Sequence, residues 1–175
     1  SIAIQSDGKI VAGGYAYGTP FNVDNTLQTY PWVAVGEGTN SIAYSRDGIT
    51  WNGIGAGIFS EWGNDVAYSA EQNRWVAVGL GTNMIAYSID GINWTGSNNS
   101  LSIFSIYGHG VAYSDQQNRW VAVGRGTNSI AYSSDGITWT GLGLSIFSDY
   151  GNGVAYSASQ NRWVAVGLGT NMIAY

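Results

Sequence analysis

The sequence predicts an all-β protein of tandem four-stranded sheets, and three observations lead to this prediction. First, a repeat runs through the 175 residues, because Trp-Val-Ala-Val-Gly recurs at intervals of 43, 45 and 43 residues. It begins at Trp32, Trp75, Trp120 and Trp163. Second, short runs rich in Val, Ile, Tyr and Trp alternate with turns of Gly, Asn, Asp and Ser, as in strands joined by tight turns. Third, apolar residues nowhere recur at helical spacing over the length of a helix, so we expect almost no helix.

One repeat contains the four expected strands in order. They cover residues 110–114, 119–124, 129–133 and 137–141, and Gln-Asn, Gly-Thr-Asn and Asp-Gly turns separate them. The second strand has apolar side chains on both of its faces, whereas a sheet with one wet face alternates apolar and polar residues. Each sheet must therefore be covered on both sides by its neighbours.

A β-propeller blade fits this pattern. Repeats of about 43 residues with four strands each, buried on both faces, are typical of propellers. Small residues such as Ala77 and Gly79 alternate with Val76 and Val78, which would let neighbouring blades approach closely. We predict one domain over residues 1–175 with four blades in this span, standing alone or forming part of a larger or oligomeric ring. A β-helix is the rival architecture, but its coils are usually shorter.

The turn between the third and fourth strands has one pattern in three repeats, Ser-x-Asp-Gly-Ile followed by Thr or Asn and then Trp. It resembles the Asp-box repeat of sialidase-type (BNR) β-propellers, Ser-x-Asp-x-Gly-x-Thr-Trp, with one residue fewer between Asp and Gly. An Asp side chain can accept hydrogen bonds from turn amides, Gly tolerates a positive φ, and Trp can pack under the hairpin. We therefore interpret these turns as structural staples. Their residues are Asp47, Trp51, Asp90, Trp94, Asp135 and Trp139.

Residues 1–31 diverge from the regular repeats and allow two alignments. In one, residues 2–14 form a first hairpin similar to the delta-60 propeller repeat, in which Asp-Gly-Lys joins two strands and the second strand ends in Gly-Gly. In the other, Asp7-Gly8 mimics an Asp box, and residues 9–13 supply a fourth strand to the last blade, which stops at Tyr175 after its third. The second alignment closes a four-bladed ring through the terminal strands. The first leaves closure to more chain or to another subunit.

The composition argues against several classes of partner. The net charge of −5, with only six Lys and Arg residues, disfavours capture of nucleic-acid phosphates or anionic lipids. No apolar run approaches the roughly 20 residues that a membrane helix needs, so we expect no membrane insertion. Cysteine is absent, which excludes disulfide and thiolate chemistry. Scarce charge and near-identical repeats suit an extracellular protein, or one on a cell or virion surface.

The resemblance to sialidase-type propellers covers the scaffold of residues 32–175 but lacks the catalytic groups. It implies three arginines around a substrate carboxylate, a tyrosine–glutamate pair and an acidic acid/base residue. Only Arg125 lies in a loop of the face expected to carry function. The other arginines are expected toward the Asp-box face: Arg46, Arg74, Arg119 and Arg162. We therefore predict no catalytic residues, no enzyme activity, no cofactor and no metal site.

A glycoside hydrolase is a remote alternative. It would need two carboxyl groups roughly 5–10 Å apart across a cleft. The candidate acids are Glu37, Glu61, Asp65 and Asp149. Glu61 and Asp65 are close in sequence, but we interpret them as solvated loop charges. The single histidine, His109, replaces the Asn of the matching repeats, so we interpret it as a varied loop position rather than a general base or metal ligand.

Binding residues are expected on the face where the Gly-x-Gly-Thr-Asn loops meet the long connections between blades, with the Asp boxes and Gln-Asn turns on the other face. Each connection carries Ile-Phe-Ser followed by an aromatic residue, and each loop offers Thr-Asn. A flat ring beside amide and hydroxyl groups suits a sugar, whose apolar face stacks while its hydroxyls form hydrogen bonds. The candidate residues are Trp62, Tyr107, Tyr150, Asn40, Asn83, Asn128 and Asn171.

These positions favour a non-catalytic, multivalent module that recognises glycans or surface proteins, with avidity from weak sites repeated on one rigid ring. The alternative hypothesis is a structural or assembly module of an extracellular or virion-surface protein. The two hypotheses differ at the aromatic residues. A lectin-like module needs them exposed and equivalent, whereas a scaffold needs them buried at contacts between blades or subunits.

Overall fold

The structure is a computed structural model that describes residues 2–4, 10–12 and 31–175. It is all-β, as the sequence predicts, and its sheets are antiparallel. The described residues contain one short helix, α1 (Ser100–Ile103). The Asp7-Gly8 turn, on which one alignment of the N-terminal segment depends, lies outside the described residues.

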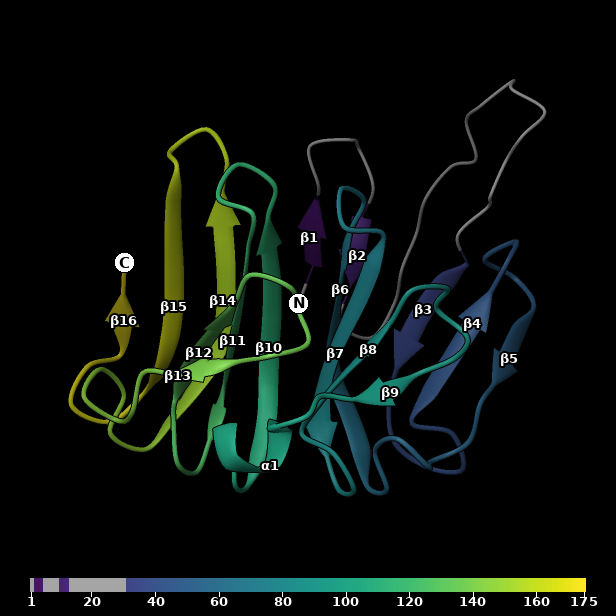
Figure 1. Ribbon diagram of the computed structural model, residues 1–175, viewed down its shortest axis with the longest axis horizontal. Helices are drawn as coiled ribbons and strands as arrows, with labels where there is room; N and C mark the ends of the chain where they lie inside the picture. Colours follow the sequence, from purple (N-terminus) through teal and green to yellow (C-terminus); the bar gives the residue numbers. More distant parts are fainter. Residues whose placement is uncertain (1, 5–9, 13–30) are drawn as a thin grey trace.

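Four sheets follow one another along the chain and stand side by side in space (Figure 1). The first contains β3 (Trp32–Val35), β4 (Ile42–Ser45) and β5 (Trp51–Gly53). The second contains β6 (Trp62–Ser69), β7 (Arg74–Leu80), β8 (Ile85–Ser88) and β9 (Thr95–Gly96). The third contains β10 (Tyr107–Ser114), β11 (Arg119–Arg125), β12 (Ile130–Ser133) and β13 (Thr140–Gly141). The fourth contains β14 (Tyr150–Ser157), β15 (Arg162–Leu168) and β16 (Ile173–Ala174), and one residue pair joins β14 to β11.

The strands of the first and third sheets differ from the prediction in number or length. The first sheet has three described strands instead of four, whereas the fourth has the three strands expected for a last blade that stops after its third. The fourth strand of the third sheet, predicted at 137–141, is reduced to Thr140–Gly141, because the Asp-Gly turn occupies the residues before it. The first strand is longer than predicted and begins at Tyr107. A β-bulge between Gly108 and Gly110 shifts its register against β11.

Each sheet has two faces of different composition, because side chains alternate along a strand. One face, here called the valine face, carries Val and Ile side chains. In the second sheet these are Val76, Val78 and Ile85. The opposite face, here called the tryptophan face, carries one Trp and two Ala side chains. In the second sheet these are Trp75, Ala77 and Ala86.

The core forms where the valine face of one sheet packs against the tryptophan face of the next. At the first interface, Val33, Val35 and Ile42 cluster with the tryptophan face of the second sheet. The same positions meet at the second and third interfaces. The phenylalanines of the Ile-Phe-Ser triplets, Phe59, Phe104 and Phe147, are fully buried within these clusters. The prediction that sheets are covered on both faces is confirmed for the second and third sheets.

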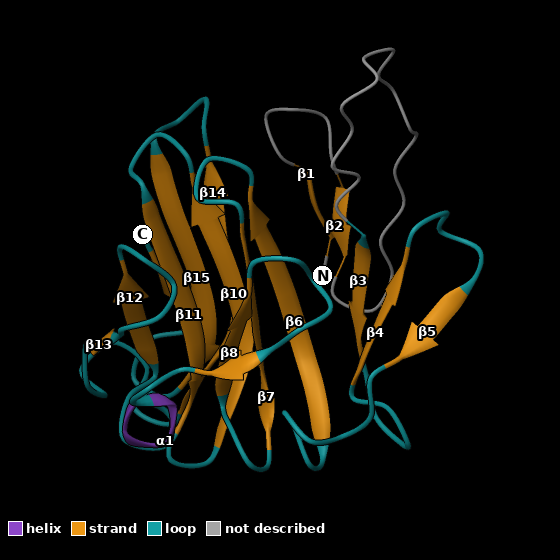
Figure 2. Ribbon diagram, turned by 45° about the vertical axis from the view of Figure 1, so that its right-hand side comes forward, coloured by secondary structure: helices purple, strands orange, loops and turns teal. Residues whose placement is uncertain are grey.

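The first strands of the sheets, β6, β10 and β14, are neighbours in space (Figure 2). A separate hairpin of β1 (Ile2–Ile4) and β2 (Ile10–Ala12) brings β2 against β6. Residues 10–12 pair with β1 in a separate two-stranded sheet, and β16 is paired with β15 at the edge of its own sheet. Residues 10–12 therefore do not extend the fourth sheet beside β16, as the ring-closing alignment required.

Candidate functional site

The three Asp-Gly turns share one hydrogen-bond pattern. In the first, Asp47 Oδ1 accepts hydrogen bonds from the N–H groups of Ile49 at 2.8 Å and Thr50 at 2.7 Å. The Ser45 hydroxyl donates to the same oxygen and accepts from the N–H of Gly48, whose φ of +75° favours glycine. The turns of Asp90 and Asp135 repeat this arrangement. These carboxylates therefore hold the hairpins together.

Hydrogen bonding lowers the pKa of all three carboxyl groups. For Asp90, partial burial raises the pKa, but hydrogen bonds from Asn93, Ile92 and Ser88 outweigh this effect and bring the pKa to about 2. The backbone N–H groups of Thr50 and Ile49 lower the pKa of Asp47. The pKa of Asp135 is also lowered, because hydrogen bonds again outweigh burial. At neutral pH these groups are charged acceptors and have no proton to give as general acids.

The asparagines of the Thr-Asn loops bind the protein's own backbone. Asn128, which is buried, donates from Nδ2 to the carbonyl of Ile103 and accepts at Oδ1 from the N–H of Gly143, both at 2.8 Å. A Cβ on Gly141 would collide with this amide, so glycine is needed there. The other loops repeat one or the other of these bonds. Asn83 and Asn171 donate from Nδ2 to the carbonyls of Ile58 and Ile146, and Asn40 Oδ1 accepts from the N–H of Gly55. These four candidate residues therefore join the loops to the connections between sheets.

The three aromatic candidates occupy equivalent positions at one rim of the sheets. Trp62, Tyr107 and Tyr150 begin β6, β10 and β14, and each is half-buried. The strand registers place them beside the second residues of the Gly-x-Gly loops. Together these residues are here called the aromatic rim: Glu37, Trp62, Leu80, Tyr107, Arg125, Tyr150 and Leu168. The structure thus brings the aromatic candidates and the Thr-Asn loops to one side of the molecule, as predicted.

Polar side chains gather beside the part of the aromatic rim that lies between the third and fourth sheets. The ring centroids of Tyr107 and Tyr150 are 6.5 Å apart, and the His109 ring lies 5.9 Å from that of Tyr107. The Arg125 guanidinium lies 5.7 Å from the centre of the Tyr150 ring and pairs with Asp149 at 2.7 Å. The pair holds both side chains beside the rings, although exposed ion pairs contribute little stability. The sequence placed Arg125 in this loop but did not predict its partner.

An open hollow of about 390 Å³ adjoins the aromatic rim near the first sheet. It is lined by Gly36, Glu37, Trp62, Gly63 and Asn64. Glu37 is the only acid in this lining, so the hollow does not supply the two carboxyl groups of a glycosidase site. Across the described part of the chain, no group of three or more His, Asp or Glu side chains is arranged to hold a metal ion.

Asp65 is buried, which corrects its interpretation as a solvated loop charge. Its Oδ1 accepts a hydrogen bond from the N–H of Val66, and its Oδ2 accepts one from the N–H of Val111 on β10, both at 3.0 Å. The matching positions in the next two repeats are Gly110 and Gly153. The carboxylate therefore links the first strands of the second and third sheets.

A chain of side-chain hydrogen bonds connects the sheets at the Gln-Asn turns, and the sequence did not predict it. Trp120 Nε1 donates to Gln72 Oε1 at 3.0 Å, and Gln72 Nε2 donates to Asn118 Oδ1 at 2.6 Å. The same two bonds join Trp163, Gln117 and Asn161. Trp75 differs, because its buried Nε1 has no hydrogen-bond partner among the described residues.

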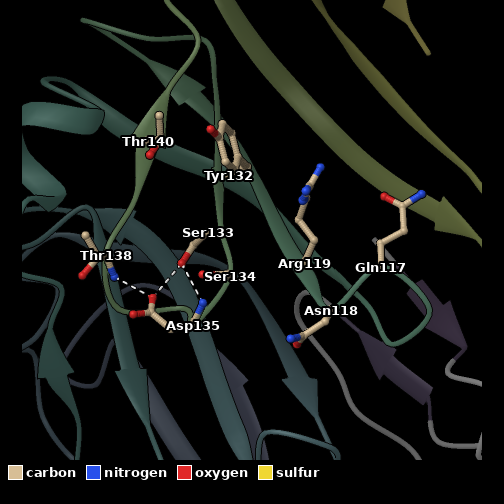
Figure 3. Close-up of a pocket in the computed structure, with 9 residues that line it drawn as sticks. All are labelled: Gln117, Asn118, Arg119, Tyr132, Ser133, Ser134, Asp135, Thr138 and Thr140. Atoms are coloured by element: carbon tan, nitrogen blue, oxygen red, sulfur yellow. Dashed lines mark hydrogen bonds between the residues drawn. The ribbon is translucent and has the colours of Figure 1, made fainter.

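A second hollow, of about 410 Å³, lies beside the Asp135 turn (Figure 3). It is lined by Gln117, Asn118, Arg119, Tyr132, Ser133, Ser134, Asp135, Thr138 and Thr140. The corresponding side chains of the second sheet are covered by the Asp135 turn of the third sheet. There, Gln72 donates to the Ser134 carbonyl at 2.8 Å and Arg74 donates to the Asp135 carbonyl. This hollow therefore corresponds to a position that is packed at the interface between the second and third sheets.

The described residues contain no helix that is both long and apolar enough to cross a membrane. Comparison with known proteins assigns the chain to no family. No protein-family model matches the sequence, and no curated protein matches it.

Proposed function

We propose that this chain is a β-propeller of Asp-box type whose four sheets are blades, acting outside the cell or on a surface as a non-catalytic, multivalent binding module. Three features support the propeller. The first strands β6, β10 and β14 are neighbours, as the innermost strands of adjacent blades are. The same two faces meet at every interface between sheets. The same stapled turn recurs in three of the sheets.

The observation that carries the binding function is the equivalence of Trp62, Tyr107 and Tyr150. Three partly buried aromatic side chains begin three successive inner strands, so equivalent positions of three repeats each offer a partly exposed aromatic side chain. Core packing alone does not require an aromatic side chain at three partly exposed positions. A sugar ring stacks on such a surface, and the Arg125–Asp149 pair and His109 supply hydrogen-bonding groups beside it.

Clustered glycans are the proposed ligand, because repeated sites on one rigid body favour polyvalent surfaces. Each site alone binds weakly, since a single stacked ring and a few exposed polar groups offer little contact area. Engaging several sites at once raises the overall affinity by roughly 10²-fold or more without any new contact.

A glycan array printed at low and high density tests this function. We expect signals that appear or strengthen steeply at high density. Tyr107→Ala and Tyr150→Ala should each lower them, and the double variant should abolish them. Tyr132→Ala is the matched control, because Tyr132 is an exposed tyrosine away from the aromatic rim. Absence of binding to every clustered glycan, with the protein folded by circular dichroism, would refute glycan recognition.

An assembly module is the second candidate, and the partial burial of the same three rings favours it. Most of each residue is already buried in the protein, and a protein partner would cover the exposed part. In that case, clustered glycans give no signal, while Tyr107→Ala and Tyr150→Ala weaken association with that partner instead.

A further inference from the structure

Two segments of the chain are identical in sequence but differ in what covers them. Residues 74–87 and 162–175 have the same fourteen residues. In the second sheet, Val76, Val78 and Ile85 are all 0% exposed. In the fourth sheet, Val164 and Val166 are 40% and 41% exposed, and Ile173 is 65% exposed. The valine face of the fourth sheet is therefore exposed, although the same residues are buried in the second sheet of the same molecule.

The second sheet also shows what covers this surface. Its valine face packs against Trp120, Ala122 and Ala131, the tryptophan face of the third sheet. The first sheet has the same residue types at the same registered positions: Trp32, Ala34 and Ala43. The tryptophan face of the first sheet thus has the residue types that cover a valine face at the interfaces between neighbouring sheets.

The Asp-Gly turn of the first sheet is also less covered than the other two. Trp51 is 37% exposed, whereas its counterpart Trp139 is 3% exposed. Gly48 is exposed, but Gly91 and Gly136 are buried, because residues of the preceding sheet pack on those two turns. Both ends of the array therefore lack, among the described residues, the neighbour that an internal sheet has.

Polar groups match as well. At the second interface, Gln72 accepts from the Trp120 indole, and Arg74 donates to the Asp135 carbonyl. The fourth sheet has Gln160 and Arg162 in these positions, and both are exposed. The groups that would complete the same bonds on the first sheet are the Trp32 indole and the Asp47 carbonyl.

We propose that the valine face of the fourth sheet binds the tryptophan face of the first sheet of a second copy of this chain, head to tail. A second copy is the fitting partner because the two faces lie at opposite ends of the array in one chain (Figure 1). The contact uses different surfaces on the two copies, so it closes into a ring or continues as a filament according to its angle. This inference depends on the packing of the sheets and not on glycan binding.

Sedimentation velocity of the 175-residue chain over a range of concentrations tests the proposal. We expect dimers or larger rings that dissociate on dilution. Val166→Glu on the valine face and Ala34→Glu on the tryptophan face should each give monomers, because each places a charge in one half of the contact. Leu101→Glu is the control, because Leu101 is exposed on α1, away from both faces. It should associate like the unaltered chain.

Mixing the two variants gives the sharpest result. Val166→Glu retains an intact tryptophan face and Ala34→Glu an intact valine face, so an equimolar mixture should form a one-to-one dimer that grows no further. A monomeric unaltered chain at every concentration would overturn the proposal. Association of both variants alone, or no dimer on mixing, would also overturn it. If Ala34→Glu fails to fold by circular dichroism, Ala43→Lys replaces it on the same face.

Discussion

Two of the tryptophans that begin the repeated Trp-Val-Ala-Val-Gly motif, Trp75 and Trp120, pack alike but differ in one hydrogen bond. Trp75 and Trp120 are both buried, and each stacks on a tyrosine at a centroid distance of 4.6 Å. Trp120 donates to Gln72, whereas the indole N–H of Trp75 has no partner in the described part of the chain. A buried donor without an acceptor costs roughly 1–3 kcal/mol. The two sites therefore separate the effect of the hydrogen bond from that of ring packing.

Replacing each tryptophan by phenylalanine should give unequal losses of stability. Trp75→Phe removes an unsatisfied donor along with part of the ring, so the lost packing is partly offset. Trp120→Phe breaks a bond and leaves Gln72 Oε1 without its donor. We expect the free energy of unfolding to fall by about 1–2 kcal/mol more for Trp120→Phe. Denaturant titration of both variants measures the difference, and equal losses would contradict this assignment.

At the scale of one element, the Asp-Gly hairpin was more predictable than the Thr-Asn loop. The hairpin's bonds join residues two and three positions apart, so Ser, Asp and Gly in that order already indicate them. Asn128 instead bonds to residues 25 and 15 positions away, and its role depends on how closely Gly141 approaches. An exposed Asn and a clamping Asn look the same in sequence. The Gln72–Trp120 bond was missed for the same reason, since its partners belong to different sheets.

The Asp-Gly hairpins should make the fold sensitive to acid. The pKa of Asp90 is about 2 when folded, against an ordinary value of 3.8. Because the folded pKa is the lower one, the ionised carboxylate stabilises the fold above about pH 4, and this contribution is lost as pH falls toward 2. Asp47 and Asp135 act in the same direction.

Thermal denaturation at pH 7, 4 and 2.5 checks this expectation for the unaltered chain and for Asp90→Asn. The asparagine keeps the Oδ1 acceptor but does not titrate, so the variant should lose less stability between pH 4 and 2.5. Glu71→Gln, which alters an exposed turn carboxylate, should retain the full acid sensitivity. A variant as acid-sensitive as the unaltered chain would contradict the role of Asp90.

Across the whole molecule, stability should follow the number of covered faces rather than the local sequence. The second and third sheets are packed on both sides, whereas the valine face of the fourth is exposed. Opening of a region costs less where fewer apolar contacts must break, so the fourth sheet should open more readily.

Hydrogen exchange can test this directly, because β7 and β15 have the same seven residues. Their amides have equal intrinsic exchange rates, so any difference reports structure. We expect faster exchange in β15 for dilute protein. Peptides that include Glu71 or Ser159 keep the two strands distinguishable by mass. Equal exchange at every concentration would show that the extra covered face does not govern opening.

The alternation of valine and tryptophan faces also bears on how such a chain lengthens. An inserted unit of about 43 residues would present a tryptophan face to the unit before it and a valine face to the unit after it, so neither junction needs new residues. Duplication of one whole unit is thus structurally neutral at both of its borders. Loss of a whole unit would likewise leave a valine face against a tryptophan face at the new junction.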